Sequence, residues 1–307
     1  MSALDLSIVI VNWNTRDLLY DCLTCLANAT GVSCETIVVD NGSTDGSLEM
    51  LRARFPEVRV IGNRTNIGFA AANNCGLAQA SARYCLLLNS DTRVAPDAPA
   101  QMVLFMDNHS DAGACGPQLR NADGTLQPSG RLFPTLASAL GELLPLPEGW
   151  RKVLRGDGQS RDYNQVCQVD EVSGAAVCLR REALDEIGLL DDEFFFLGED
   201  IDLCWRLKRA GWKVFYVPDA RVVHLWGGSR NRVDNYAISL LSQRAYYLLF
   251  RKHRSKATAL LLKAIIFLLT LLKLVKWLVR AAVRLDARLA RQVAIAHGKE
   301  WMWMWRH

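Results

Sequence analysis

Strand and helix patterns alternate along the first 115 residues of the chain. Residues 6–11 (LSIVIV) form a continuous apolar run rich in β-branched side chains, which is typical of a parallel strand buried on both faces. Further strands are predicted at residues 35–39, 58–61, 84–88 and 112–115, with helices at 17–29, 47–54, 68–80 and 96–108. This alternation predicts an α/β fold with a mostly parallel sheet and right-handed crossovers.

The middle of the chain is less regular. Residues 116–170 are rich in Gly, Pro and polar residues, which indicates an irregular insertion or lid. Regular patterns return with a strand at 172–179, helices at 181–187 and 199–210, and a strand at 213–217, and the chain reads as helical from residue 235. We expect one domain over residues 1–250, with the insertion at 116–170, and a helical extension over residues 251–307.

Charge is divided unevenly within the net charge of +4. Residues 244–307 contain 14 Lys and Arg against two acidic residues, whereas the remainder of the chain is net acidic. This division argues against nucleic-acid binding across the fold and predicts a tail that binds an anionic partner, with a membrane surface as the main candidate. The nine scattered cysteines indicate free thiols in a reducing compartment.

The tail has the pattern of an amphipathic helix. Residues 257–285 are strongly hydrophobic but are interrupted by Lys263, Lys273, Lys276, Arg280 and Arg284, so the longest charge-free run has nine residues. A spanning helix needs about 20 apolar residues. The five cations lie on one side of a helix, so we expect it to lie in the membrane interface. Packing on the domain or on a second subunit, and a spanning helix, are the alternatives.

Acidic residues follow three of the predicted strands. Asp40 ends one strand, Asp91 comes just past another, and Glu199 and Asp200 open a helix after residues 194–196 (FFF). Because ligand crevices of open α/β sheets form at the carboxyl ends of the strands, we expect these acids to converge. Each acid alone is also explained by a turn or a helix N-terminus. Their shared placement favours a functional site.

These acids suit chemistry on a nucleoside-diphosphate compound. A departing diphosphate needs a divalent cation, and Mg²⁺ or Mn²⁺ takes oxygen ligands with few protein contacts. Asp91 is the candidate ligand. A second carboxylate must deprotonate an acceptor hydroxyl, and Asp200 is the first candidate for this base, with Glu199 second. Asp40 is expected to orient the nucleoside.

Seven segments resemble the family 2 glycosyltransferases of GT-A fold, and most closely the bacterial rhamnosyltransferases that build cell-surface polysaccharides. They are SIVIVNWN (7–14), IVVDNGSTDGS (37–47), NIGFAAANNCGL (66–77), LLLNSDT (86–92), VSGAAVCLRREAL (172–184), FFFLGEDIDLCWRLKRAGWKV (194–214) and VVHLWGGS (222–229). The segments occur in order over about residues 5–250. The resemblance implies a GT-A fold, a Rossmann-like, mixed and mostly parallel sheet with flanking helices.

The resemblance also implies a role at each matching position. The nucleotide-sugar side comprises Val11, Asn12, Asp40, Asn66, Gly68, Phe69, Asn73, Asn89 and Ser90. Asp91 and His224 match metal-site positions, and Asp200 matches the general base. Gly174 and Ala175 resemble the acceptor-side wall, and Trp226 is a candidate for stacking on a sugar. Asn89 departs from the family's Asp-x-Asp pattern, which weakens the case for a metal, although the rhamnosyltransferase branch commonly has Asn there.

The implied activity is inverting transfer of L-rhamnose from dTDP-L-rhamnose to a lipid-linked or glycan acceptor, peripherally at the cytoplasmic face of the inner membrane. UDP-hexoses and UDP-galactofuranose are alternative donors, and an oligomer is compatible with the pattern. A nucleotidyltransferase would show a glycine-rich and basic loop after the first strand, whereas this chain has Asn12-Trp13-Asn14-Thr15. A non-catalytic nucleotide-sugar-binding protein is a further alternative.

Overall fold

The computed structural model describes residues 4–144, 146–155, 162–225 and 235–283. The chain divides into two compact units. The first comprises Met1–Phe133 and Arg161–Asp234, and the second comprises Pro134–Ser160 and Asn235–His307. Residues 134–160 therefore group with the helical part of the chain.

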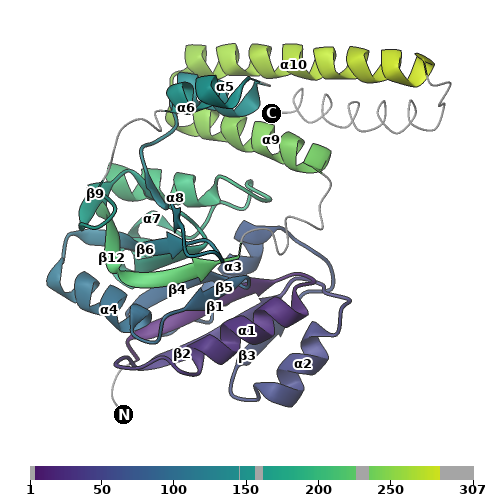
Figure 1. Ribbon diagram of the computed structural model, residues 1–307. Helices are drawn as coiled ribbons and strands as arrows, with labels where there is room; N and C mark the ends of the chain where they lie inside the picture. Colours follow the sequence, from purple (N-terminus) through teal and green to yellow (C-terminus); the bar gives the residue numbers. More distant parts are fainter. Residues whose placement is uncertain (1–3, 145, 156–161, 226–234, 284–307) are drawn as a thin grey trace. The chain divides into compact units, whose positions relative to one another are not determined.

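The first unit is built on a mixed sheet with strand order β3-β2-β1-β4-β11-β6-β12-β5, to which β7 and β9 add (Figure 1). The parallel half consists of β1 (Leu6–Asn12), β2 (Cys34–Asp40), β3 (Arg59–Gly62) and β4 (Tyr84–Asn89). The other half contains β5 (Thr92–Val94), β6 (Ala112–Arg120), β7 (Leu126–Gln127), β9 (Cys167–Val169), β11 (Ala176–Arg180) and β12 (Lys213–His224). Antiparallel β11 joins the halves by pairing with β4 and β6.

Helices bury both faces of this sheet. Alternate residues of β1 point to opposite faces, so Ile8 and Ile10 pack with one core cluster and Val9 packs with another. The first cluster takes in α1 (Arg16–Leu26), α2 (Ser47–Arg54) and α4 (Ala98–Asn108). The second takes in α3 (Phe69–Leu77), α7 (Arg181–Ile187) and α8 (Glu199–Arg209). Burial on both faces explains the uninterrupted apolar run of β1.

The structure corrects the predicted strand at 172–179. The chain instead forms β10 (Glu171–Val172), which pairs with β8 (Gly130–Arg131), and then turns before β11 begins at Ala176. Within this turn Ala176 N donates to the carbonyl of Ser173 at 3.3 Å, and Gly174 N donates to Asp200 on α8 at 2.8 Å. Strand β12 is longer than predicted, because an irregularity in its pairing with β6 lets it continue past Pro218.

The second unit is helical. It contains α5 (Leu136–Leu143), α6 (Glu148–Arg155), α9 (Asn235–His253) and α10 (Lys256–Val283). The segment 116–170 is thus more regular than its composition indicates, because its short strands and helices are bounded by the Gly, Pro and polar residues that obscure them. A capping box between Thr135 and Ser138 opens α5. None of the helices in the described ranges is long and apolar enough to cross a membrane.

Candidate active site

The carboxyl ends of β1, β2 and β4 carry a buried hydrogen-bond network. Asn12 lies opposite Asp40 in the sheet and donates from Nδ2 to Asp40 Oδ2 at 2.9 Å. Asn12 Oδ1 accepts from Thr15 Oγ1 at 2.7 Å, and Thr15 Oγ1 lies 2.8 Å from Ser90 Oγ. The other oxygen of Asp40 accepts from Ser43 N at 2.9 Å. The structure therefore brings the predicted residues Asn12, Asp40 and Ser90 together.

Asn41, which the sequence analysis did not single out, ties the next loop to this edge. Its Nδ2 donates to Asn66 Oδ1 at 3.0 Å and to the carbonyl of Gly68 at 3.2 Å, and its Oδ1 accepts from Ile67 N at 3.1 Å. The sequence signal that could have identified Asn41 is its position directly after Asp40 in a turn-forming run. Gly68 has φ +96°, and a Cβ there would lie 2.9 Å from Phe195, so the predicted glycine meets both a conformational and a steric requirement.

The remaining donor-side residues predicted from the sequence are mostly buried. Phe69 N donates to the carbonyl of Phe195 at 2.7 Å, which links α3 to the loop before α8. Asn73 bonds the carbonyl of Phe69 within α3, and Val11 packs with Val39 and Ala72. Asn73 thus contacts the backbone of its own helix, and Val11 lies in a small apolar cluster at the end of β1.

Asp91 and His224 form a close buried pair. The side chains are 10% and 6% exposed, and His224 Nε2 lies 3.3 Å from Asp91 Oδ1. The pair is positioned because β5 and β12 run antiparallel with His224 opposite Thr92, and because Leu225 N donates to the carbonyl of Asp91 at 2.9 Å. On its other side, His224 Nδ1 contacts Gln127 Oε1 at 2.8 Å. No sequence pattern indicated Gln127.

The Asp91–His224 pair fits a divalent cation that completes its coordination with phosphate oxygens. Magnesium and manganese sites of this kind use one or two carboxylates together with substrate phosphates, and imidazole also binds first-row metals. Asn89, two residues before Asp91, has a buried Oδ1 with no hydrogen-bond partner. Groups of three or more His, Cys, Asp and Glu suited to a metal do not occur in the part of the chain that the structure describes. Among the described residues, Asp91 and His224 are thus a candidate pair of cation ligands.

Asp200 lies in the first turn of α8, and backbone donors hold it in place. Gly174 N donates to its Oδ2 at 2.8 Å, and Ile201 N donates to its Oδ1 at 2.9 Å. The next residue of the turn, Ala175, accepts a 2.9 Å hydrogen bond from Asn89 N through its carbonyl. Gly174 and Ala175 therefore connect Asp200 to the end of β4, so the three acidic segments do meet at one edge of the sheet.

Two buried glutamates flank Asp200. Burial, reinforced by Asp200, raises the pKa of Glu199 to about 8. Burial also raises the pKa of Glu171 to about 8, where Arg131 opposes the shift and Asp200 adds to it. Each glutamate has a buried Oε2 without a hydrogen-bond partner. Both therefore carry protons at neutral pH, whereas Asp200 is only partly buried.

The sequence pattern indicates Glu199 but not Glu171. Glu171 sits on the two-residue strand β10, three positions before Gly174, and only the fold places it near Asp200. Trp226, the candidate stacking residue, lies outside the described residues.

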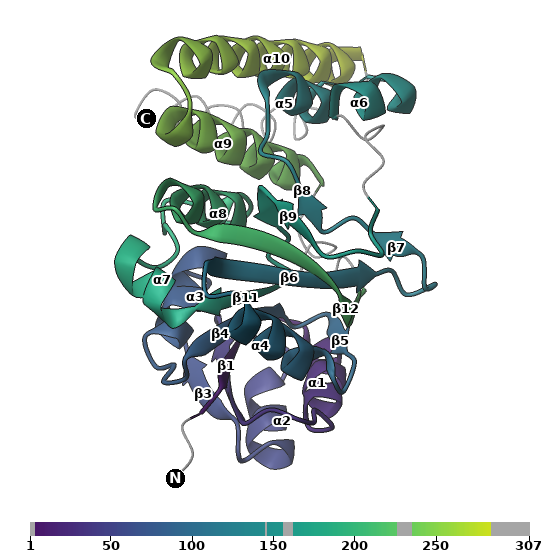
Figure 2. The same ribbon diagram turned by 90° about the vertical axis from the view of Figure 1, so that its left-hand side faces the viewer.

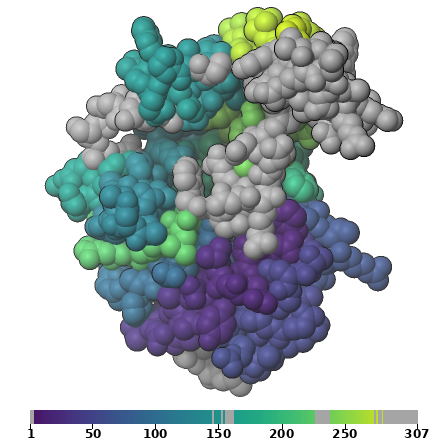
Figure 3. Space-filling model, turned by 45° about the vertical axis from the view of Figure 1, so that its right-hand side comes forward, coloured from purple at the N-terminus to yellow at the C-terminus, as the bar shows by residue number. Residues whose placement is uncertain are grey.

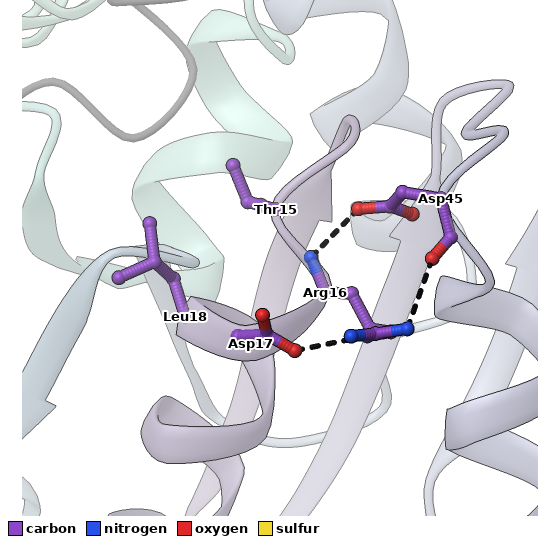
Figure 4. A pocket seen from close by; sticks show the side chains of 5 residues that line it. All are labelled: Thr15, Arg16, Asp17, Leu18 and Asp45. Atoms are coloured by element: carbon purple, nitrogen blue, oxygen red, sulfur yellow. Dashed lines mark hydrogen bonds and ion pairs between the residues drawn. The ribbon is translucent and has the colours of Figure 1, made fainter.

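A shallow hollow of about 350 Å³ opens beside Thr15 (Figure 4). It is lined by Thr15, Arg16, Asp17, Leu18 and Asp45, and Arg16 N donates to Asp45 Oδ2 at 2.9 Å. In the space-filling view, the N-terminal segment (purple) borders the surface of residues around 50–100 (blue) (Figure 3). The hollow adjoins the network at the strand ends but does not include Asp200.

Comparison with known proteins defines the class. Residues 7–188 match the model of glycosyl transferase family 2, and residues 148–304 match that of glycosyl transferase family group 2. The chain belongs to glycosyl transferase family 2, which confirms the predicted family. The choice between glycosyl transfer and nucleotidyl transfer is thereby decided for glycosyl transfer.

Among individual relatives, the chain is close to a rhamnosyltransferase. It is 29% identical over 264 residues to the N-acetylglucosaminyl-diphospho-decaprenol L-rhamnosyltransferase of Mycobacterium tuberculosis, a match that covers 81% of this chain and 85% of the relative.

Solved structures confirm the predicted GT-A fold. The mannosyltransferase PcManGT of Pyrobaculum calidifontis, in complex with GDP-Man and Mn²⁺, matches with a TM-score of 0.57 and 17% identity over 99% of this chain and 84% of its own. GalNAc-T7 with UDP, GalNAc and Mn²⁺ matches with a TM-score of 0.58 and 18% identity over 81% of this chain and 48% of its own.

Proposed function

We propose that this chain is an inverting, metal-dependent glycosyltransferase that transfers L-rhamnose from dTDP-L-rhamnose to a lipid-linked saccharide during cell-surface polysaccharide synthesis. The observation that carries the proposal is the meeting of three groups at one sheet edge: the Asn12–Asp40–Ser90 network, the Asp91–His224 pair and the Asp200 carboxylate. The rhamnosyl donor and the lipid-linked acceptor are supported by the activity in the name of the mycobacterial relative.

The donor side of the site comprises the strand-end network and the loop around Asn66. Asp40 shapes the nucleoside pocket through Asn12 and Ser43, and Asn66 and Gly68 shape the wall beside it. A divalent cation held by Asp91 and His224, with Asn89 beside them, would offset the negative charge on the departing diphosphate. The Mn²⁺ present with UDP in GalNAc-T7 and with GDP-Man in PcManGT is consistent with this role.

Asp200 is the proposed base. It takes the proton of the acceptor hydroxyl as the hydroxyl oxygen bonds to the anomeric carbon. The bond from that carbon to the diphosphate breaks on the opposite face, and dTDP leaves with the electron pair. The neutral Glu199 and Glu171 beside Asp200 add no negative charge that would repel the diphosphate at neutral pH.

A product assay tests the proposal. The purified chain is incubated with polyprenyl-diphosphate N-acetylglucosamine, Mg²⁺ or Mn²⁺, and one of dTDP-L-rhamnose, UDP-glucose or UDP-galactofuranose. We expect equal amounts of dTDP and rhamnosylated lipid from the first donor alone, with inverted anomeric configuration by NMR. Transfer from a UDP-sugar would replace the donor assignment. Donor binding without transfer would favour a nucleotide-sugar-binding protein.

The helical unit supports a second part of the proposal, attachment to the cytoplasmic face of the plasma membrane. One face of α10 exposes a run of large apolar side chains at helical spacing: Leu260, Leu261, Phe267, Leu268, Leu272, Val275 and Val279. The opposite face is buried through Ala259, Leu262 and Ile266. An exposed apolar face on a helix with an excess of basic residues suits an anionic lipid surface. The tail after Val283 lies outside the described residues.

A further inference from the structure

The hairpin formed by β6 and β7 carries a line of hydrogen bonds that ends on His224. In this hairpin β7 pairs with one end of β6 (Figure 2), and β6 also pairs with β12. Gln127, on β7, contacts His224 Nδ1 through Oε1 at 2.8 Å and donates from Nε2 to Asn121 Oδ1 at 2.9 Å. Asn121 Nδ2 then donates to Thr125 Oγ1 at 2.9 Å, and Thr125 Oγ1 donates to Asp123 Oδ1 at 2.6 Å.

The carboxylate at the far end gives every bond in the line its direction. Hydrogen bonds from the hydroxyl and the backbone N–H of Thr125 hold the pKa of Asp123 below its usual value, so Asp123 is an acceptor at neutral pH. The single hydroxyl proton of Thr125 is donated to Asp123, so Thr125 Oγ1 can only accept a hydrogen bond from Asn121. The Asn121 amide is thereby oriented with Oδ1 toward Gln127.

The orientation of Asn121 determines the orientation of the Gln127 amide and the tautomer of His224. Gln127 must present Nε2 to Asn121, which leaves its Oε1 facing His224. An amide oxygen only accepts, so the Nδ1 atom of His224 must carry a proton. In a neutral imidazole the lone pair then sits on Nε2, the nitrogen 3.3 Å from Asp91 Oδ1. Two electron-pair donors therefore face each other, an arrangement that a bound cation stabilises.

We propose that Gln127 is a positioning residue for the metal site: through the Asp123–Thr125–Asn121 line it fixes the His224 tautomer that presents Nε2 to a divalent cation shared with Asp91. This inference rests on the proposed metal-dependent function. Outer groups that fix the tautomer of a metal-binding histidine typically change metal affinity about 10–100-fold when they are removed. The Gln127–His224 contact also connects the β6–β7 hairpin to the site. Strand β7 lies within the segment 116–170 that was predicted to be an insertion.

Two substitutions at Gln127 separate hydrogen bonding from packing. Gln127→Met keeps the length of the side chain and removes the acceptor, whereas Gln127→Glu keeps an acceptor oxygen. Leu126→Ala is the matched control, because Leu126 lies on the same strand, is 37% exposed and takes no part in the line. Mn²⁺ binding to the full chain in the presence of dTDP is measured by electron paramagnetic resonance.

We expect Gln127→Met to weaken Mn²⁺ binding about 10–100-fold, and Gln127→Glu and Leu126→Ala to stay within a few-fold of wild type. Equal loss in Gln127→Met and Gln127→Glu, unchanged binding in Gln127→Met, or no Mn²⁺ binding by the wild type would each overturn the proposal.

The tautomer itself is read without metal or substrate. Nitrogen-15 NMR at alkaline pH, where a histidine is neutral, distinguishes protonated Nδ1 from protonated Nε2, and a His224→Phe sample assigns the resonance. We expect protonated Nδ1 in the wild type, and a proton on Nε2 overturns the inference. A chain that shows protonated Nδ1 and binds Mn²⁺ but transfers no sugar would refute the proposed function and leave the role of Gln127 standing.

Discussion

The backbone N–H of Gly174 donates to Asp200 Oδ2 at 2.8 Å, which joins the turn between β10 and β11 to the first turn of α8. A Cβ added at Gly174 would lie 3.2 Å from both Cβ and Oδ2 of Asp200. That spacing is tighter than ordinary van der Waals contact, so any larger residue must move the carboxylate or the turn. The proposed base and its support therefore depend on a glycine.

The first prediction concerns this glycine. Gly174→Ala should lower kcat by up to about 10-fold with a small change in KM for the donor. The added Cβ would displace the base by a few tenths of an ångström, which weakens proton transfer more than donor binding. Steady-state kinetics measure both constants. Gly149→Ala is the control, since nothing lies within 4 Å of a Cβ at Gly149. A parallel loss in the control, or a change confined to KM, would argue against a base at Asp200.

The second prediction contrasts Asp200 with its neighbour. Asp200→Asn should reduce transfer about 10²–10⁴-fold and leave donor affinity nearly unchanged, because the amide cannot accept the proton. Glu199→Gln should be much milder at neutral pH, because the raised pKa of Glu199 makes the native side chain a neutral acid that glutamine resembles. Transfer assays and donor titration by calorimetry measure the two effects. A larger loss in Glu199→Gln than in Asp200→Asn would assign the base to Glu199.

The third prediction is a pH dependence of stability. The pKa of Glu171 rises from 4.5 to about 8 on folding, so between these values the folded chain holds a proton that the unfolded chain has lost. The unfolded state then binds fewer protons, and the free energy of unfolding falls as pH rises through this window. Glu171→Gln removes the contribution. Wild type should therefore lose stability relative to Glu171→Gln between about pH 5 and pH 8, measured by urea unfolding.

Glu142→Gln is the control for that titration, because it makes the same change at a side chain that is 35% exposed. The stability difference between wild type and this variant should stay nearly constant over the same pH range. A constant difference for Glu171→Gln as well would mean that Glu171 ionises normally in the folded chain.

Local pattern was enough to predict the parallel half of the sheet. The runs that became β1 and β4 are apolar because both faces are buried, and turn residues mark their ends. The convergence of Asp40 and Asp91 followed from the rule that ligand crevices form at strand ends. The assignment to the glycosyltransferase family followed from seven motifs that occur in the family's order and spacing.

Contacts made by pairing over long separations could not be predicted in this way. Gln127 meets His224 across 97 positions of sequence, and its own neighbours read as an ordinary polar turn. Glu171 looks like an exposed residue beside Asp170, and only its strand pairing and the packing of α8 bury it. In both cases the function of the residue depends on a partner that no local pattern specifies.

The last prediction concerns the apolar face of α10. Leu261, Leu268 and Leu272 are 51%, 53% and 56% exposed, so replacing them by Glu removes apolar contact with lipid and leaves the buried face of the helix intact. The triple variant should lose most of its binding to vesicles that contain anionic lipid, measured by flotation, while transfer to a short water-soluble acceptor persists. Leu104→Glu, at a position 56% exposed on α4, should bind the vesicles like wild type. If the triple variant still floats with the vesicles, this face does not contact lipid. If instead its mass in solution falls to half that of wild type, contact with a second copy of the chain is the better explanation.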